Sequence, residues 1–219
     1  MALFKPEKKE STGDWTGYKQ MGIESITDKS DQFDWADVYL EFAMKVEGSK
    51  YPRNMYLSGS FDREDDGSLK DSGLFRRIYH VFDILGFDGG LNIKGEWENS
   101  DGTKIDDIGK TLSDKYAPDV PFDDPKMNLI GYVYREAPRK GGNGKIFTRV
   151  HHYIHHNTNE GMAFIKDRIN FLRTKGFIKE ASEDQINGLM GAGTVQTGPA
   201  VNGGPRTVDN VEGSVVNQL

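Results

Sequence analysis

The sequence predicts a mainly β fold with helices, a β-barrel type, and three observations support that class. Apolar and polar residues alternate in several short stretches, most regularly over 37–47, 129–135 and 146–154, and alternation with period two is typical of half-buried strands. Glycine-rich or polar turns separate these stretches. One segment, 74–85, has helical spacing instead. A chain of 219 residues with 36% hydrophobic content can bury one substantial core.

The first three expected strands come from the N-terminal third of the chain. Strand 18–26 alternates weakly, and the connection 27–35 is polar and turn-like. Strand 37–47 is the clearest in the sequence, and strand 50–61 follows it after a short turn. Their apolar positions can share one face, so these two strands are expected to form a hairpin.

A helix is expected next, capped by Asp71 or Ser72 and stopped by Gly86. Its apolar residues recur at helical spacing, and they are Leu74, Ile78, Val81, Phe82 and Leu85. The stretch 87–121 is punctuated by glycines and predicts only a short helix over 105–116. A long loop without structure is uncommon in a compact domain, so an unrecognised element is expected there.

Two further strands, 129–135 and 146–154, are joined by the basic, glycine-rich turn 139–145. Glycine and asparagine tolerate the positive φ that a tight hairpin requires. An amphipathic helix, docked on the sheet, is expected over 159–175. Three strands, a helix and a two-stranded hairpin occur in this order in the five-stranded Greek-key barrel called the OB fold, with the helix between strands 3 and 4.

The expected domain organisation has three parts. Residues 1–16 form a flexible N-terminus, residues 17–180 the OB-fold nucleic-acid-binding domain with its C-terminal helix, and residues 181–219 a disordered tail. No stretch approaches the length of a membrane span or has the apolar core of a secretory signal. We therefore expect a cytoplasmic protein without a membrane segment.

Charge is distributed unevenly along this acidic chain. The net charge is −6, yet residues 131–179 hold ten Lys/Arg against three acids, so that this stretch carries +7 and the remainder −13. Phosphate binding depends on local cations, so an acidic total is compatible with a basic binding surface. Clustering by chance is the alternative explanation. The absence of cysteine excludes disulfides and thiolate metal sites, and no cofactor is expected.

The strand faces expected to meet water carry rings and cations. Rings beside cations suit stacking on unpaired bases and neutralisation of phosphates. In the OB fold, ligands lie across strands 2 and 3 between the loops that join strands 1 and 2 and strands 4 and 5. The candidate nucleic-acid-binding residues are the rings Tyr39, Tyr56, Tyr132, Tyr134, Phe147 and Tyr153 and the cations Lys45, Arg53, Arg135, Arg139, Lys140, Lys145 and Arg149.

Over residues 18–156 the chain resembles phage-encoded single-stranded-DNA-binding proteins of the OB type. The resemblance lies in the order and spacing of LEFAMKVEGSKYPRNMYLSGSF, LFRRIYHVFDILG and LIGYVYREAPRKGGNGKIFTRVHHY. It implies a protein that coats single-stranded DNA during replication or recombination in an infected bacterial host, without sequence preference or catalysis. Many such proteins recruit replication or recombination proteins through an acidic C-terminal tail. This tail has only Asp209 and Glu212 near its end, which departs from that pattern. The resemblance leaves open whether the protein forms a homo-oligomer.

Two other functions compete with this interpretation. The acidic segment 62–71 or the histidines of 151–156 could serve a divalent-metal-dependent nuclease, although neither has the spacing of a known metal motif. A structural, assembly or protein-interaction β-barrel would use the same strands with its tyrosines in a protein interface. Neither the acidic segment nor the histidine segment favours catalysis, so a non-enzymatic binding protein is expected.

Overall fold

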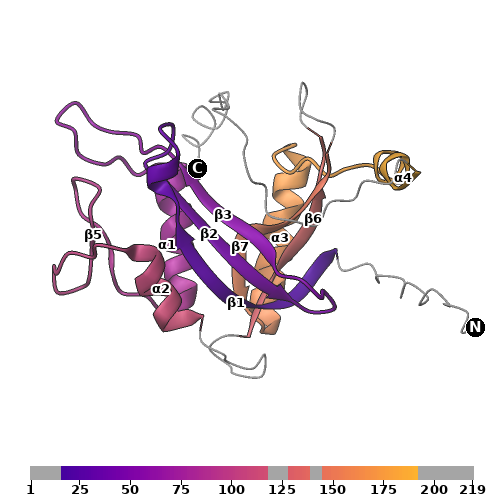
Figure 1. Cartoon of the computed structure of the whole chain (residues 1–219), viewed down its shortest axis with the longest axis horizontal. Coiled ribbons are helices and arrows are strands. Elements are labelled where there is room, and N and C mark those ends of the chain that lie inside the picture. The colour runs from indigo at the N-terminus through magenta and orange to yellow at the C-terminus, as the bar shows by residue number, and fades with distance from the viewer. Residues whose placement is uncertain (1–15, 118–127, 139–144, 192–219) are drawn as a thin grey trace, which may run out of the picture.

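The computed structural model describes residues 16–117, 128–138 and 145–191. Its elements are β1 (Gly17–Asp28), a 3-10 turn (Ser30–Gln32), β2 (Val38–Val46), β3 (Arg53–Gly59), α1 (Gly73–Leu85), β4 (Gly90–Leu91), β5 (Trp97–Glu98), α2 (Ile108–Tyr116), β6 (Leu129–Glu136), β7 (Phe147–His156), α3 (Asn159–Thr174) and α4 (Glu183–Gly191) (Figure 1). The predicted class, mainly β with helices, is confirmed.

Five strands form one antiparallel sheet in the order β3-β2-β1-β6-β7. In the described part of the chain, the edge strands β3 and β7 are not paired by hydrogen bonds, so the sheet is not closed into a barrel. The predicted closure is therefore wrong. The two edges meet through side chains instead, since the guanidinium of Arg149 on β7 lies 4.9 Å from the ring centre of Tyr56 on β3.

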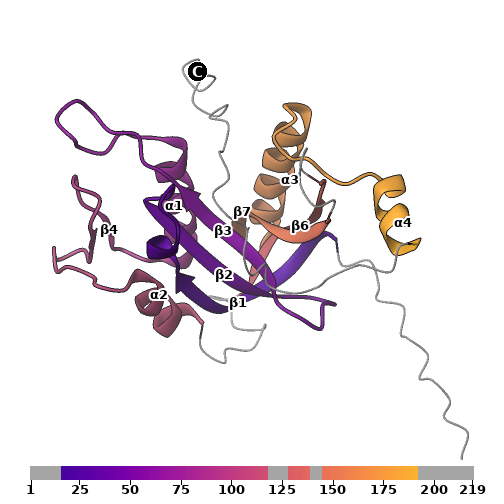
Figure 2. The same ribbon diagram turned by 45° about the horizontal axis from the view of Figure 1, so that its top comes forward.

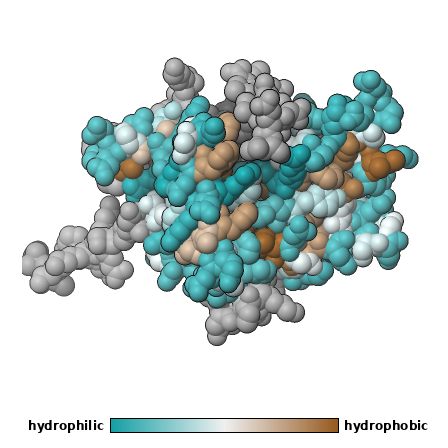
Figure 3. Space-filling view, turned by 180° about the vertical axis from the view of Figure 1, so that it is seen from behind, coloured by the Kyte–Doolittle hydropathy of each residue, from teal (hydrophilic) through white to brown (hydrophobic). Residues whose placement is uncertain are grey.

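The main core lies on the inner face of β1, β2 and β3. In the β2–β3 pair, Phe42 lies opposite Met55 and Leu40 opposite Leu57, and all four are at most 1% exposed. The predicted hairpin is confirmed. Full burial of each such side chain stabilises the fold by about 1.5–3 kcal/mol. The outer surface seen from behind Figure 1 is mostly hydrophilic, with separate hydrophobic areas (Figure 3).

Helix α1 closes this core with its apolar stripe, and its predicted ends are confirmed. The Ser72 hydroxyl accepts a hydrogen bond from the backbone N–H of Phe75 at 3.4 Å, and Gly86 ends the helix with φ 66°. The five predicted stripe residues are all buried. Helix α1 also contacts β7, and β7 lies between α1 and α3 (Figures 1 and 2).

Helix α2 docks against the end of β1. Asp107 caps the helix by accepting a hydrogen bond from the N–H of Lys110 at 2.7 Å. Gly109 allows close contact, because a Cβ there would lie 2.3 Å from the backbone nitrogen of Asp28. The helix expected over 105–116 is thus present, but it starts three residues later.

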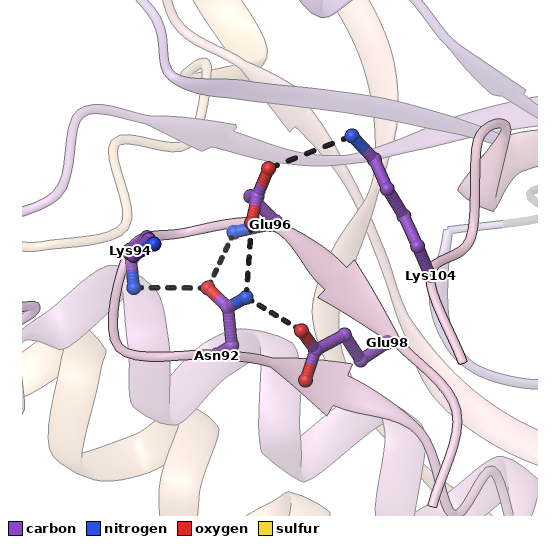
Figure 4. A network of polar contacts seen from close by, with 5 residues as sticks. All are labelled: Asn92, Lys94, Glu96, Glu98 and Lys104. Atoms are coloured by element: carbon purple, nitrogen blue, oxygen red, sulfur yellow. Dashed lines mark hydrogen bonds and ion pairs between the residues drawn. The ribbon is translucent and has the colours of Figure 1, made fainter. Parts of the chain in front are cut away.

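The β4–β5 hairpin is an element that the sequence interpretation missed. Its turn is held by Asn92, whose side-chain oxygen accepts from the backbone N–H groups of Lys94 at 2.9 Å and Glu96 at 3.0 Å. The Asn92 amide donates to the carboxylates of Glu96 and Glu98 at 3.1 and 2.6 Å (Figure 4). Asparagine often forms such local turns, but the two-residue strands are too short for a periodic signal.

Helix α3 covers part of the outer face of the sheet. Ile165 and Ile169 of α3 are fully buried against Ile130 and Tyr132 of β6, which makes a second, smaller core. The chain then returns along β6, where the N–H of Ala137 donates to the carbonyl of Lys179 and the N–H of Ala181 donates to that of Arg135, each at 2.8 Å. These contacts fix the segment that follows α3 to the end of β6.

The segment 181–219, expected to be disordered, includes helix α4 over Glu183–Gly191. The other residues of this expected tail lie outside the described residues, as do residues 1–15 of the flexible N-terminus expected over 1–16. Among the helices that the structure describes, none combines the length and the apolar character needed to cross a membrane.

Candidate nucleic-acid interface

Rings and one guanidinium form a continuous cluster on the outer face of β2, β3 and β7. We call this cluster the aromatic row, and its members are Phe33, Trp35, Tyr39, Tyr56, Phe147 and Arg149. Every member is half-buried, so each is held in place yet keeps exposed surface. Four members are residues that the sequence predicted as binding residues, and the structure brings them together.

Four rings make the first half of the row. Phe33 stacks on Tyr39 with 4.3 Å between ring centres and 30° between planes. Trp35 meets the same tyrosine edge-on at 6.0 Å, and Tyr39 meets Tyr56 at 5.7 Å and 64°. These distances lie within the range of attractive aromatic pairs.

The loop that carries Phe33 and Trp35 is fixed by side chains at its ends. The carboxylate of Asp28 accepts from the backbone N–H of Ser30 at 2.9 Å, and the Ser30 hydroxyl accepts from the N–H of Tyr39, also at 2.9 Å. At the other end, the Ser60 hydroxyl donates to the carbonyl of Trp35 at 2.6 Å. The two rings therefore sit on an ordered connection that is tied to β2 and to the end of β3.

Arg149 makes the second half of the row. Its guanidinium lies 4.9 Å from the ring centre of Tyr56 and 5.2 Å from that of Phe147, within the range of cation–π contacts. It also donates to the carboxylate of Glu136 at 2.6 Å. Burial lowers the pKa of Arg149, but Glu136 outweighs this and leaves the pKa raised. The cation is thus permanent, and it is partly neutralised by its carboxylate partner.

The hydroxyl of Tyr39 stays neutral over the whole physiological pH range. Burial raises its pKa to about 12, and Tyr56 and Glu41 add to the effect. The carboxylate of Glu41 is itself paired with the ammonium of Lys29 at 3.0 Å. The row therefore presents uncharged ring faces beside compensated charges, a combination that suits stacking by neutral bases.

Phe33 and Trp35 are members that the sequence interpretation missed. They lie in the connection 27–35, which was predicted only as a polar turn. Two aromatic residues spaced two apart, directly before a strand whose outer face begins with Tyr39, are the signal that could have identified them. In the OB arrangement the loop between strands 1 and 2 borders the ligand surface.

Three predicted rings lie outside the row, and one of them is sealed. Tyr132 is only 5% exposed, because α3 covers it. Its hydroxyl donates to Glu180 and accepts from Arg173. The expectation that this ring is open to solvent is wrong. Tyr134 and Tyr153 are half-buried.

The remaining predicted cations are dispersed. Arg53 lies on the same face of β3 as the core residues Met55 and Leu57 and is 8% exposed, so it does not share the face of Tyr56, and its burial lowers its pKa. Arg135 lies opposite Thr148, on the other side of the pleat from Tyr134. Lys45 is half-buried on the outer side of β2, and Lys145 is exposed. Arg139 and Lys140 lie outside the described residues.

The two segments that suggested a nuclease lie in different surroundings. The acidic segment 62–71 is mostly exposed, whereas His151 is buried and His152 is half-buried. In the segment 62–71, Asp66 accepts from Ser68 within a turn, and the ammonium of Lys70 lies 3.1 Å from the carboxylate of Glu64. Within the described ranges, no three His, Cys, Asp or Glu side chains come together as a metal site would require. His151 and His152 are held neutral, since burial lowers the pKa of the first to about 3 and that of the second well below its usual value.

Comparisons with known proteins give the chain no relative. Neither a protein-family model, nor a curated protein, nor a solved structure matches it.

Proposed function

We propose that this protein binds single-stranded DNA without sequence preference and without catalysis, by stacking bases on the aromatic row. The observation that carries the proposal is the run of half-exposed rings across β2, β3 and β7, closed by Arg149. Stacking on such rings tolerates any base, because every base has a π-face. A surface of this kind serves a protein that coats unpaired DNA in phage replication or recombination.

The strand order supports an OB-type arrangement as part of this proposal. An OB sheet places strand 1 between strands 2 and 4 and brings strands 3 and 5 together. Here β1 lies between β2 and β6, and Arg149 of β7 reaches Tyr56 of β3. We propose that the fold is an open variant of that arrangement, in which β3 and β7 are connected by side chains and not by backbone hydrogen bonds. The OB ligand surface on strands 2 and 3 then coincides with Tyr39 and Tyr56.

A fluorescence-anisotropy titration with labelled oligo-dT and a matching duplex tests the proposal. We expect binding to the single strand at low salt, much weaker binding to the duplex, and a steep loss of affinity with rising salt. No binding, or equal binding to both forms, would remove the proposal.

Substitution of a single ring of the aromatic row tests whether the row is the DNA-binding surface. Tyr56→Ala should weaken oligo-dT binding by about 1–3 kcal/mol, since one stacking platform is lost. Tyr51→Ala is the matched control, because Tyr51 is 54% exposed in the turn before β3 and lies outside the row. A Tyr56 variant that melts like the wild type and binds with unchanged affinity would exclude the row as the binding surface.

A further inference from the structure

A second set of rings and cations lies on α3. Phe164, Arg168, Phe171 and Lys175 recur at spacings of four, three and four residues, so they share one side of the helix. We call this set the α3 stripe. Phe164 and Phe171 are 40% and 47% exposed, although neighbouring positions of the same helix are fully buried against the sheet.

The rings and cations of the α3 stripe are in contact with one another. The guanidinium of Arg168 lies 5.6 Å from the ring centre of Phe171, and the ammonium of Lys175 lies 6.0 Å from it. Arg168 also donates to the hydroxyl of Tyr153 at 2.7 Å and lies 4.7 Å from its ring centre. In the part of the chain that the structure describes, neither Arg168 nor Lys175 forms an ion pair with a carboxylate. Among the described residues, no carboxylate therefore neutralises the charge of either cation.

Strand β7 connects the α3 stripe to the aromatic row. Arg149 of the row pairs with Tyr134 of β6, and Tyr134 and Tyr153 both pack against the second core beneath α3. Tyr153 in turn contacts Arg168 of the stripe. Along this part of β7 the register with β6 shifts, since Ile154 pairs with Gly131 and Val150 with Val133, so β7 bulges here and is shorter than a regular strand with the same number of residues. In this stretch His151 stacks on Tyr153 with 5.3 Å between ring centres. A chain that leaves the row along β7 therefore arrives at the stripe.

We infer that the α3 stripe is a second binding surface for the same single strand, which takes the nucleotides beyond those held by the aromatic row. This inference rests on the proposed function. Charge favours a polyanion as the occupant, since both cations lack carboxylate partners among the described residues. Exposed rings held beside cations are the combination that stacks bases while neutralising phosphates.

The inference predicts a length dependence that separates the two surfaces. OB-type sites hold between about 4 and 16 nucleotides, so dT oligomers of about 6 and about 20 nucleotides distinguish the row from the row plus the stripe. The double variant Arg168→Gln/Phe171→Ala should bind the long oligomer about tenfold more weakly. It should bind the short oligomer as the wild type does. The number of nucleotides covered per protein at saturation should also fall.

Lys94→Gln is the control, because Lys94 is an exposed cation in the β4–β5 turn, at the other end of the molecule from α3 (Figures 1 and 2). It should leave both affinities unchanged. Wild-type affinity of the double variant for both lengths, or equal weakening for both, would overturn the inference. So would unchanged DNA binding with an altered sedimentation coefficient, which would assign the stripe to protein association. If the wild type itself binds neither oligomer, the proposed function fails first.

Discussion

At the scale of single residues, the ion pair between Arg149 and Glu136 sets the charge of the aromatic row. Both side chains are largely shielded, with 24% and 19% of their surfaces exposed, and the bond between them is 2.6 Å long. A phosphate that approaches Arg149 must compete with this carboxylate. The pair therefore orders the guanidinium over Tyr56 while it lowers the attraction for a polyanion.

Removal of the carboxylate should reveal that competition. Glu136→Gln keeps the shape of the side chain but removes its charge, so oligo-dT affinity should rise several-fold. The slope of log affinity against log salt should steepen by about one phosphate contact. Anisotropy titrations at three salt concentrations measure both quantities. Glu64→Gln, which breaks an exposed ion pair with Lys70 in the segment before α1, is the control. Weaker binding by the Glu136 variant would mean that the pair is needed for orientation.

At the scale of elements, the docking of α2 on β1 depends on a glycine. Gly109→Ala should destabilise the protein by about 1–3 kcal/mol, because the new Cβ would lie 2.3 Å from the backbone nitrogen of Asp28. This cost opposes the gain in helix propensity, which favours alanine by about 1 kcal/mol. Urea denaturation monitored by tryptophan fluorescence gives the free energy of unfolding.

A second glycine provides the matched control for this prediction. Gly73 begins α1 with open space around the position of its Cβ, so Gly73→Ala should leave stability unchanged or raise it. Equal effects of the two substitutions would show that α2 shifts freely on β1.

Elements with a local signal could be predicted from the sequence, and elements defined by distant contacts could not. The β2–β3 hairpin follows from strict alternation, and α1 follows from its spacing, its Ser72 cap and its Gly86 stop. The β4–β5 hairpin depends on the side chain of Asn92, which periodicity does not register. Alternation correctly places Tyr132 on the outer face of the sheet. It does not predict that α3 and the segment after it, about 40 positions later in the chain, bury this ring.

The same distinction applies to the candidate site. The faces of Tyr39 and Tyr56 follow from strand parity, whereas the inclusion of Phe33 and Trp35 depends on how the connection 27–35 folds back. The pairing of Arg149 with Glu136 depends on the register between β6 and β7, which the sequence does not specify.

At the scale of the whole molecule, the buried histidines couple stability to pH. Burial, with Arg77 and Arg168 adding to the effect, lowers the pKa of His151 to about 3. Its Nδ1 accepts from the backbone N–H of Tyr153 at 3.2 Å, which requires an unprotonated nitrogen. In the unfolded chain a histidine titrates near pH 6.5. Between these values the unfolded state binds more protons, so stability falls as the pH falls.

The expected loss is about 1.4 kcal/mol per pH unit below pH 6.5 for each neutral buried histidine. Urea midpoints at pH 7.5, 6.0 and 5.0 measure the effect in a window where most carboxylates stay ionised. His151→Gln retains an acceptor for the N–H of Tyr153 and should make the dependence shallower. A free energy of unfolding that is constant between pH 7.5 and 5.0 would contradict this prediction.

The residues that cover β6 are synthesised after all the strands of the sheet, which affects how the protein folds during translation. Residues 17–156 supply every strand of the sheet, whereas Ile165, Ile169 and Ile178, which shield Ile130 and Tyr132, are translated later. Domains form from the N-terminus during synthesis, so a nascent chain passes through a stage with a paired sheet and a bare apolar strip. A chain ended after Thr158 should therefore bind a hydrophobic dye, and one ended after residue 191 should not. The synthesis of α3 and of the segment that follows it thus ends the stage at which this apolar strip is exposed on the nascent chain.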